Sequence, residues 1–511
     1  MRMKYDRLPQ ADGEDGEDQS RPNRMERTRT NDSFGMSNVS PQATNVTTIP
    51  TNHDSLDGLI PNRDNETSPL PNDHETTPQI QYRTYRRRFV GLAQLVLLNI
   101  VVSWDWLTFA AVSSTSATYF GVPETSINWL STGFLFAFIV VSPLVIYTLH
   151  TGGPRRSILV ASTLVLLGNW IRYAGTRDLR HGHGRFGVVM FGQILIGFAQ
   201  PFVLAAPTRY SNLWFSDTGR VTATAIASLA NPFGAALGQL IGPLWVDPSK
   251  VGAGIPNMVL YTSILSTIAC LPAPFIPAGP PSPPSAFAAE EKLDLREALR
   301  VLPKNVSFWL LFVAFSIYVG FFNAFSSLIN QTFEPYGFSE TEAGIAGGLL
   351  IVVGLIASAV VSPIVDRTKA YLATIKSIVP LIAAGYLVLI FMPGTRNVVG
   401  PYIVCSILGA TSFSLLPCAL EYLVIVTHPV SPEITSTICW TGGQLLGAVF
   451  IIIMDALKGG WSGQPQESLI RGLIFQAVVA WVAVPFAMSL GVGRGRLGAT
   501  LHGNVHRSET T

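Results

Sequence analysis

Twelve long apolar stretches dominate the chain from residue 89 onward, and they constrain its fold more than any other feature. An apolar helix of about 20 residues spans the hydrocarbon core of a bilayer, and each stretch reaches that length. Because helices satisfy their own backbone hydrogen bonds in lipid, the pattern predicts an all-α membrane protein with about twelve transmembrane helices. We expect the spans at residues 89–118, 127–149, 156–175, 186–208, 220–245, 256–277, 306–332, 341–365, 371–392, 399–426, 432–457 and 469–491.

Composition supports this class and argues against several others. Charged residues make up 13% of the 511 residues, against roughly 25% in soluble domains. The formal net charge of +2 gives no reason to expect nucleic-acid binding. All four cysteines lie in apolar stretches, which is unlike a disulfide framework or a metal site, and "HGHG" at 181–184 is typical of a solvated turn. We find no nucleophile–base pairing and no phosphate-binding glycine loop, so we expect neither enzymatic activity nor a cofactor.

Five regions follow from the order of the stretches. Residues 1–82 are rich in Asp, Asn, Thr, Ser and Pro, a composition that predicts disorder. Two sets of six spans occupy residues 83–277 and 306–491, and residues 492–511 form a short tail. Between the sets, residues 278–305 open with "PAGPPSPPS" and continue as a charged amphipathic piece. We expect that piece to lie on the membrane surface.

Basic residues beside the spans predict the orientation in the membrane. "RTYRRR" precedes the first span, and the central linker and the start of the C-terminal tail are also basic. This side is therefore expected in the cytoplasm, together with both tails. The loop "RYAGTRDLRHGHGR", residues 172–185, is a basic exception on the opposite side. With this orientation we expect the sequons of the N-terminal tail to be unused. They lie at Asn31, Asn38, Asn45 and Asn65.

A short repeat relates the two sets of six spans. "VVSPLVIYTLHTGGPRRS" leaves the second span, and "VVSPIVDRTKAYLATIK" leaves the eighth. Two repeated halves of six helices are typical of the major facilitator superfamily. In that superfamily both turns usually carry an Asp followed by basic residues. Asp366 and Arg367 fit this pattern, whereas His150 stands in the first turn, ahead of Arg155. We interpret both turns as gating elements.

The first span contains an acid in an apolar setting, Asp105, between Trp104 and Trp106. A charge at a membrane centre costs on the order of 3 kcal/mol, so such a group usually has a functional partner. Asp105 is a candidate counter-ion for a cationic substrate or a candidate proton carrier. The alternative is a protonated acid that is hydrogen-bonded to a neighbouring helix. Small and polar residues recur along one side of this span, and Trp106 is the only large residue among them, so we expect its ring to face a central cavity.

Other polar residues lie inside the predicted spans, and most are amides that can join neighbouring helices by hydrogen bonds. Glu421 is an acid, and it joins Asp105 as a candidate coupling or counter-ion group. Glycines recur four residues apart in the fifth span, where they favour close helix packing. The polar candidates are Gln193, Gln200, Asn323, Asn330, Gln331, Glu421 and Gln444, and the glycines are Gly234, Gly238 and Gly242.

Four stretches resemble the feline leukaemia virus subgroup C receptor (FLVCR) family, a branch of the major facilitator superfamily that includes the lysosomal DIRC2-like proteins. They are "INWLSTGFLF", "GQILIGFAQPFVLAAPTRYSNLWF", "NAFSSLINQTF" and "PVSPEITSTICWTGGQLLG". "GRVTATAIAS" is more similar to the lysosomal branch, whereas "INQTF" is more similar to FLVCR. The resemblance implies a carrier of choline or ethanolamine, with haem and vitamin B6 as alternatives within the family.

The resemblance also implies a binding site. In the choline carriers, a tryptophan of the first span and a tyrosine of the seventh enclose the quaternary ammonium, and glutamines of the fourth and eleventh spans complete the site. The matching positions here are Trp106, Gln200 and Gln444. Asn323 replaces the tyrosine, and Asp105 replaces an uncharged residue. Loss of one aromatic wall removes part of a cation–π attraction of about 1–2 kcal/mol, which an added carboxylate could offset.

These features predict a carrier that moves a small organic solute, with an amine favoured, by alternating access. A membrane receptor or nutrient sensor that transports nothing is the alternative from another class. We expect a monomer in a lipid bilayer, with the solute as its partner and the proton as a candidate coupling ion. The plasma membrane is favoured over a vacuolar or lysosomal membrane.

Overall fold

The computed structural model describes residues 83–177, 184–246, 251–284, 295–428, 430–459 and 465–491. All of them belong to one of the two units into which contacts divide the chain, the unit from Thr77 to Thr511. The described residues are mostly helical, and none of them lies in a β-strand, which confirms the all-α class. The predictions for the N-terminal tail and its sequons, for the C-terminal tail and for most of "HGHG" lie outside the described residues.

Within these ranges, twelve helical segments are long and apolar enough to cross a membrane, which confirms the number of spans expected from the sequence. The first six are built from α1 (Arg88–Leu107), α2 (Ser113–Phe120), α3 (Glu124–Thr176), α4 (Phe186–Leu204), α5 (Ala206–Trp214), α6 (Asp217–Trp245) and α7 (Val251–Cys270). The last six are built from α10 (Val306–Phe333), α11 (Glu340–Thr368), α12 (Tyr371–Leu389), α13 (Val399–Thr427), α14 (Pro432–Ala456) and α15 (Ile470–Met488). Short 3-10 helices lie at η1 (Ala110–Val112), η3 (Ala273–Phe275), η4 (Leu302–Lys304), η5 (Glu334–Tyr336) and η6 (Pro393–Thr395).

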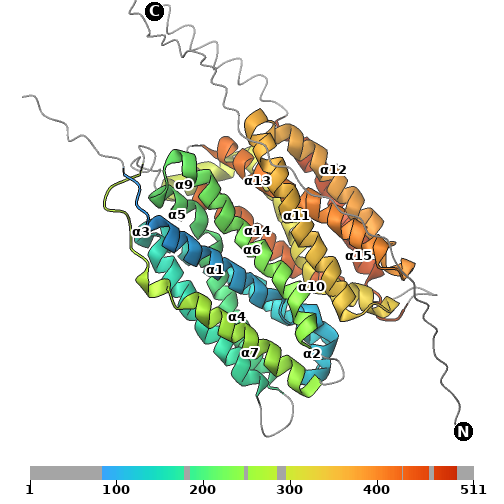
Figure 1. Ribbon diagram of the computed structural model, residues 1–511. Helices are drawn as coiled ribbons and strands as arrows, with labels where there is room; N and C mark the ends of the chain where they lie inside the picture. Colours follow the sequence, from blue (N-terminus) through green and yellow to red (C-terminus); the bar gives the residue numbers. More distant parts are fainter. Residues whose placement is uncertain are drawn as a thin grey trace, which may run out of the picture. The chain divides into compact units, whose positions relative to one another are not determined.

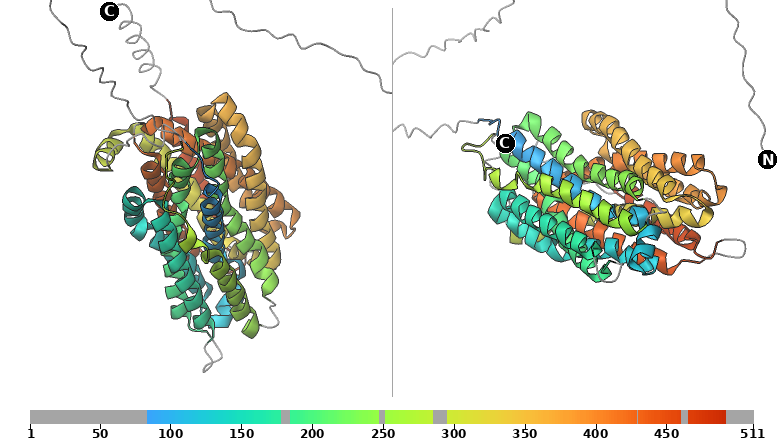
Figure 2. Two further views of the ribbon diagram at one scale, coloured as in Figure 1. Left: turned by 60° about the vertical axis from the view of Figure 1, so that its left-hand side comes forward. Right: turned by 60° about the horizontal axis from the view of Figure 1, so that its bottom comes forward.

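Each half of the chain forms its own bundle, and the two bundles lie side by side (Figures 1 and 2). In the first half α1 packs along α6 and α3 along α4, and in the second half α10 packs along α14 and α11 along α13. Between the halves, α6 contacts α11 and α3 contacts α14. We call the end of the bundle at which α1 begins the basal end, and the end at which α2 gives way to α3 the distal end.

The second and third spans, Glu124–Leu149 and Thr151–Thr176, are both part of α3, which is kinked at Gly153 near the start of the third span. Gly153 has φ of 68° and ψ of 176°, a backbone conformation that residues with a side chain rarely adopt. Pro154 follows at once, and its fixed φ suits the first turn of the next helix. The basic turn expected here is therefore a sharp kink with almost no loop.

The first span is interrupted, which differs from the continuous helix expected at 89–118. The helix α1 ends at Leu107, η1 follows, and α2 begins only at Ser113. Val112 has φ of −131° and ψ of 50°, which lies outside the helical region. Backbone polar groups freed inside a membrane protein need other partners, and the Gln193 side chain of α4 donates to the carbonyl of Asp105, 3.2 Å away.

The described end of the central linker forms a short helix, α9 (Leu295–Val301), which packs on the second bundle. Ala298 is completely buried in a small apolar cluster with Val430 and Ile434, at the start of α14. The position of the linker on the membrane surface stays a prediction.

Candidate functional site

The ring of Trp106 lies in the middle of the molecule, at the end of α1. It is 4% exposed and stacks on Phe134 of α3, with 6.4 Å between ring centroids and 19° between ring planes. The indole Nε1 is buried and has no hydrogen-bond partner among the described residues. Buried indole N–H groups usually find a partner, so this one is available to a ligand.

A pair of amide side chains in the second half lies on the opposite side of the interface between the bundles from Trp106. Asn323 of α10 donates through Nδ2 to Oε1 of Gln444 on α14, at 3.1 Å. One turn further along α14, Gly447 lies so close to Asn323 and to Leu135 of α3 that a Cβ there would be 2.9 Å from Asn323 Cβ and 3.3 Å from Leu135 Cδ1. Since Leu135 is next to the Phe134 on which Trp106 stacks, a short chain of contacts links the tryptophan to the amide pair.

Gln200 approaches the same region from α4. Gly197, one turn before it, packs against the backbone of Phe134, at 2.8 Å from an added Cβ to the carbonyl oxygen. The side chain of Gln200 is 3% exposed, and its Oε1 has no hydrogen-bond partner in the described part of the chain. Phe134 and Leu135 of α3 therefore lie between Trp106, the turn of α4 that precedes Gln200, and the packing of Gly447 against Asn323. The role of the four positions as substrate contacts stays a prediction.

Asp105 has its own cation inside the protein. Its Oδ1 lies 3.1 Å from Nη1 of Arg172, and the two side chains are 1% and 0% exposed. Its Oδ2 accepts from Asn169 Nδ2 at 2.5 Å and from Ser266 Oγ at 3.4 Å. These partners come from α3 and α7, so the carboxylate points into the first bundle. A substrate cation would have to compete with a guanidinium that already occupies this place.

Arg172 and Asn169 are the functional candidates that sequence reasoning missed. Arg172 was counted with the basic loop 172–185, although it lies within the described helix α3 and is completely buried. One signal was present in the sequence. "NWIR" places an amide and a guanidinium three residues apart, on the same face of a helix, at the end of an apolar stretch.

The other charged candidates lie away from this centre. Glu421 lies within the candidate span Val399–Thr427, toward the end of α13 that approaches Lys369 and Asp366, and its side chain is exposed. Its role as a coupling or counter-ion group stays a prediction. Asp366 accepts from the Tyr371 hydroxyl at 3.0 Å, across the turn between α11 and α12, and Arg367 is exposed. In the first turn, Arg155 is half-buried, and the side chain of His150 lies outside the described residues. The gating role of both turns stays a prediction.

The distal ends of the two halves are joined by a cluster that we call the distal latch, made of Ser113, Thr115, Asn330 and Glu340. Glu340 Oε1 accepts from the backbone N–H of Thr115 at 3.0 Å, and its Oε2 accepts from the Thr115 hydroxyl at 2.8 Å. Asn330 donates to Ser113 Oγ at 3.0 Å and to Glu340 at 3.4 Å. The first two residues belong to α2 and the last two to α10 and α11, so the latch closes the bundle at this end.

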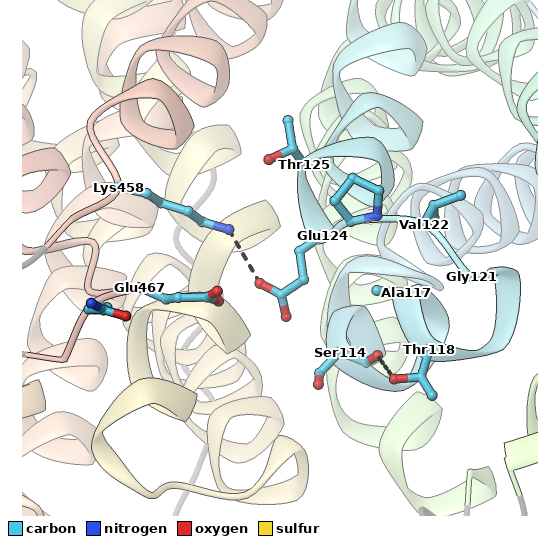
Figure 3. Close-up of a pocket in the computed structure, with 11 residues that line it drawn as sticks. Ser114, Ala117, Thr118, Gly121, Val122, Glu124, Thr125, Lys458 and Glu467 are labelled. Atoms are coloured by element: carbon cyan, nitrogen blue, oxygen red, sulfur yellow. Dashed lines mark hydrogen bonds and ion pairs between the residues drawn. The ribbon is translucent and has the colours of Figure 1, made fainter.

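Two further contacts flank the latch. Asn128 of α3 and Gln331 of α10 exchange hydrogen bonds at 2.7 and 3.2 Å, and Asn128 also donates to Asp455 of α14 at 2.8 Å. Beside them lies an open pocket of about 650 Å³ at the boundary of the two halves. Figure 3 shows Glu124 of the first half and Lys458 of the second meeting in it, 3.3 Å apart.

We expect Glu340→Gln to loosen the distal latch. The two donors of Thr115 bond to different oxygens of Glu340, and in glutamine an NH2 group, which cannot accept, replaces one of these oxygens. The charge is lost as well, and hydrogen bonds to charged groups contribute about 1.5–3 kcal/mol. The open form should rise on the order of tenfold or more. We would measure it as the rate at which a maleimide labels Ser113→Cys in purified protein.

The background of that assay is low because the four native cysteines are all buried. Glu342→Gln is the matched control, since Glu342 lies half a turn away on α11 and caps that helix through Ser339. Equal labelling rates for Glu340→Gln and the parent would show that the latch does not hold the two halves together.

Comparison with known proteins identifies the family. The family described as Major Facilitator Superfamily matches residues 95–450. The chain belongs to the major facilitator superfamily. Within this superfamily it belongs to the FLVCR-related solute carrier family 49, because a Danio rerio protein named solute carrier family 49 member A3 is 33% identical over 383 residues. That alignment covers 74% of this chain and 80% of the relative.

A Felis catus relative, named choline/ethanolamine transporter FLVCR1, is 28% identical over 466 residues, which cover 86% of this chain and 82% of that protein. Among solved structures, a D-xylose–proton symporter superposes with a TM-score of 0.60 at 14% identity, over 79% of this chain and 97% of the symporter. This similarity confirms the major facilitator fold. The protein is thus an integral multi-pass membrane transporter rather than an enzyme.

Proposed function

We propose that this transporter carries a small organic amine of the ethanolamine or choline type, through a central site formed by Trp106, Gln200, Asn323 and Gln444. The observation that carries the proposal is the buried N–H of Trp106, which has no partner among the described residues, together with buried amides that belong to both halves. An aromatic face attracts an ammonium group. A site that lies between two bundles can be reached from either end as the bundles rock.

The amides favour an amine that can donate hydrogen bonds. Gln200 Oε1 is a free buried acceptor, and Trp106 Nε1 is a free buried donor. A primary ammonium with a hydroxyl group two carbons away offers a donor and an acceptor, and thus complements both. Asn323, where the choline carriers have a second aromatic ring, takes away one wall of a cage for a quaternary ammonium. We therefore propose that ethanolamine is preferred over choline.

The charge of the substrate is balanced in this proposal by the indole face and the amide dipoles. Asp105 is not assigned as the direct counter-ion, because Arg172 occupies its carboxylate. Glu421 is not assigned to the site either, because it is exposed near the basal end. Proton coupling, a monomeric state and the plasma membrane as location remain predictions from the sequence.

Trp106→Ala should raise the apparent KM for ethanolamine about 5- to 30-fold, the equivalent of the 1–2 kcal/mol of a desolvated cation–π contact. Uptake of labelled ethanolamine and choline into vesicles that contain the purified protein is the measurement. Trp104→Phe is the matched control, because Trp104 stacks on Trp245 of α6, at 5.7 Å between ring centroids, on another side of α1.

Three results would change the proposal in different ways. Binding of the amine without net uptake would favour the receptor or sensor interpretation. Uptake of pyridoxine or haem, with no competition by amines, would keep the carrier and reject the substrate class. An unchanged KM in a well-folded Trp106→Ala variant would remove the tryptophan from the site.

A further inference from the structure

The helix α1 ends at Leu107, one residue after Trp106. Near this end, side chains of neighbouring helices form hydrogen bonds with the backbone carbonyls. Gln193 of α4 donates through Nε2 to the carbonyl of Asp105 at 3.2 Å and approaches that of Trp106 at 3.5 Å. Arg172 Nη1 lies 3.4 Å from the Asp105 carbonyl oxygen. The Thr108 hydroxyl donates a hydrogen bond to the carbonyl of Trp104 at 3.0 Å. The last carbonyls of α1 are therefore contacted by side chains.

Arg172 contacts one residue before the end of α1 and one residue after it. On one side it forms the ion pair with Asp105, and on the other its guanidinium lies over the ring of Phe109, 5.0 Å from the centroid. Phe109 is 1% exposed and lies in the turn between α1 and η1, where its backbone keeps φ and ψ close to helical values. A planar guanidinium suits this position, because it can pair with a carboxylate and stack on a ring at once.

The ring of Trp106 is held by apolar packing and not by hydrogen bonds. It is 4% exposed and stacks on Phe134, and its Nε1 makes no hydrogen bond to the described residues. The backbone at positions 105 and 106 sets how the ring enters this packing, and Arg172 and Gln193 both contact that backbone. Every partner of this arrangement belongs to α1, α3, α4 or α7, so it can stay intact while the distal latch opens.

We propose that the buried Asp105–Arg172 pair is a positioning device, which holds the interrupted first span so that Trp106 faces the substrate. This inference rests on the proposed function for its transport readout, and it goes beyond it by giving Asp105 a structural partner instead of the substrate. Asp105 and Arg172 are positioning residues that act through Trp106. A direct counter-ion and a purely structural pair are the two alternatives that an experiment has to separate.

The test uses a neutral pair, Asp105→Asn with Arg172→Met, which leaves no single charge buried. We would measure KM and Vmax for ethanolamine in vesicles, with the neutral pair placed in the parent and in Trp106→Ala. If the pair acts through Trp106, it raises KM severalfold in the parent and adds nothing in Trp106→Ala, because contacts that act through one residue are not additive. Equal increases in both backgrounds would indicate direct contact with the substrate. An unchanged KM in the parent would leave only a structural role.

A second readout needs no substrate. In protein labelled with 5-fluorotryptophan, the fluorine resonance of Trp106 is identified by its loss in Trp106→Phe. We expect it to shift or broaden in the neutral pair and to stay in place in the control variant Arg177→Met. Arg177 directly follows α3, is exposed and lies over the Tyr173 ring. An unmoved resonance in the neutral pair overturns the proposal. If the parent protein transports no amine, the proposed function is wrong. The position of the Trp106 fluorine resonance in the neutral pair then still tests the positioning role.

Discussion

Asp105→Asn should be the most destabilising single substitution in the first bundle, with a loss of about 3–5 kcal/mol in the free energy of unfolding. The reason is the guanidinium that stays behind. Arg172 is fully buried, and arginine cannot give up its proton in a protein. An amide at position 105 also turns N–H groups toward a cation when its oxygen keeps the hydrogen bond from Asn169.

The reverse substitution should cost less. In Arg172→Met the isolated carboxyl can take up a proton and so avoid a buried charge. The methionine keeps an apolar contact with Phe109, since sulfur packs well at aromatic rings. The double variant should recover most of the stability, because replacing both ions of a buried pair by neutral groups is often close to neutral.

Thermal unfolding of the four proteins in one detergent measures this order, with Arg177→Met as the control for loss of an exposed arginine directly after the same helix. The expected ranking is parent and double variant, then Arg172→Met, then Asp105→Asn. A double variant as unstable as Asp105→Asn would mean that the charges are not paired across the bundle.

The spans were predictable because a membrane imposes them. A bilayer requires about 20 apolar residues per helix, and the twelve stretches met that requirement before any tertiary contact was considered. The sharp turn at Gly153 was also foreseeable as a short connection, since a glycine followed by a proline ends one helix and begins another. These features depend on local sequence and on the medium.

The interrupted first span and the ion pair inside it depend on tertiary contacts. Nothing in "SWDWLTFAAVSS" forbids a continuous helix, and the interruption is compensated by Gln193 and Arg172 from other helices. Arg172 stands at the end of an apolar stretch, where a positive charge is usually read as the flank of a span. Its burial follows from the position of Asp105 on another helix. Sequence reasoning therefore found the acid and missed its cation.

The candidate binding site also combines positions that the sequence can predict with contacts that depend on tertiary structure. Helical periodicity and family resemblance predict Trp106, Gln200, Asn323 and Gln444 as substrate contacts, and the structure shows a direct contact within one pair of them, Asn323 and Gln444. The hydrogen bond between Asn323 and Gln444 joins α10 to α14, so no local pattern could have predicted it. Glu421 was selected for lying inside an apolar stretch, but depth along a helix is set by the neighbouring helices, and its carboxylate is exposed.

The three glycines of the fifth span differ in how closely they approach the first span. Gly234, Gly238 and Gly242 were expected to permit close packing, and α6 does pack along α1. A Cβ at Gly234 would lie 2.0 Å from the backbone carbonyl oxygen of Ile100. At Gly238 the nearest atom is the Trp104 carbonyl oxygen, at 3.1 Å, and at Gly242 it is Ala111 Cβ, at 3.6 Å. A methyl group would thus clash at Gly234, fit tightly at Gly238 and make an ordinary van der Waals contact at Gly242.

Alanine substitutions along this row should therefore differ in a graded way. Each one gains the same helix propensity, up to about 1 kcal/mol over glycine, and narrows the unfolded ensemble equally. The differences between them then isolate the contact with α1.

At Gly234 the opposing atom is backbone, which no rotamer change can move, so α1 and α6 must separate. Overpacking of this kind costs about 1–3 kcal/mol and sometimes more. We expect Gly234→Ala to lower the midpoint of thermal unfolding clearly, Gly238→Ala to lower it slightly, and Gly242→Ala to leave it unchanged or raise it. Equal midpoints for all three would contradict the close approach of the two helices, because a loose interface would accommodate every methyl group alike.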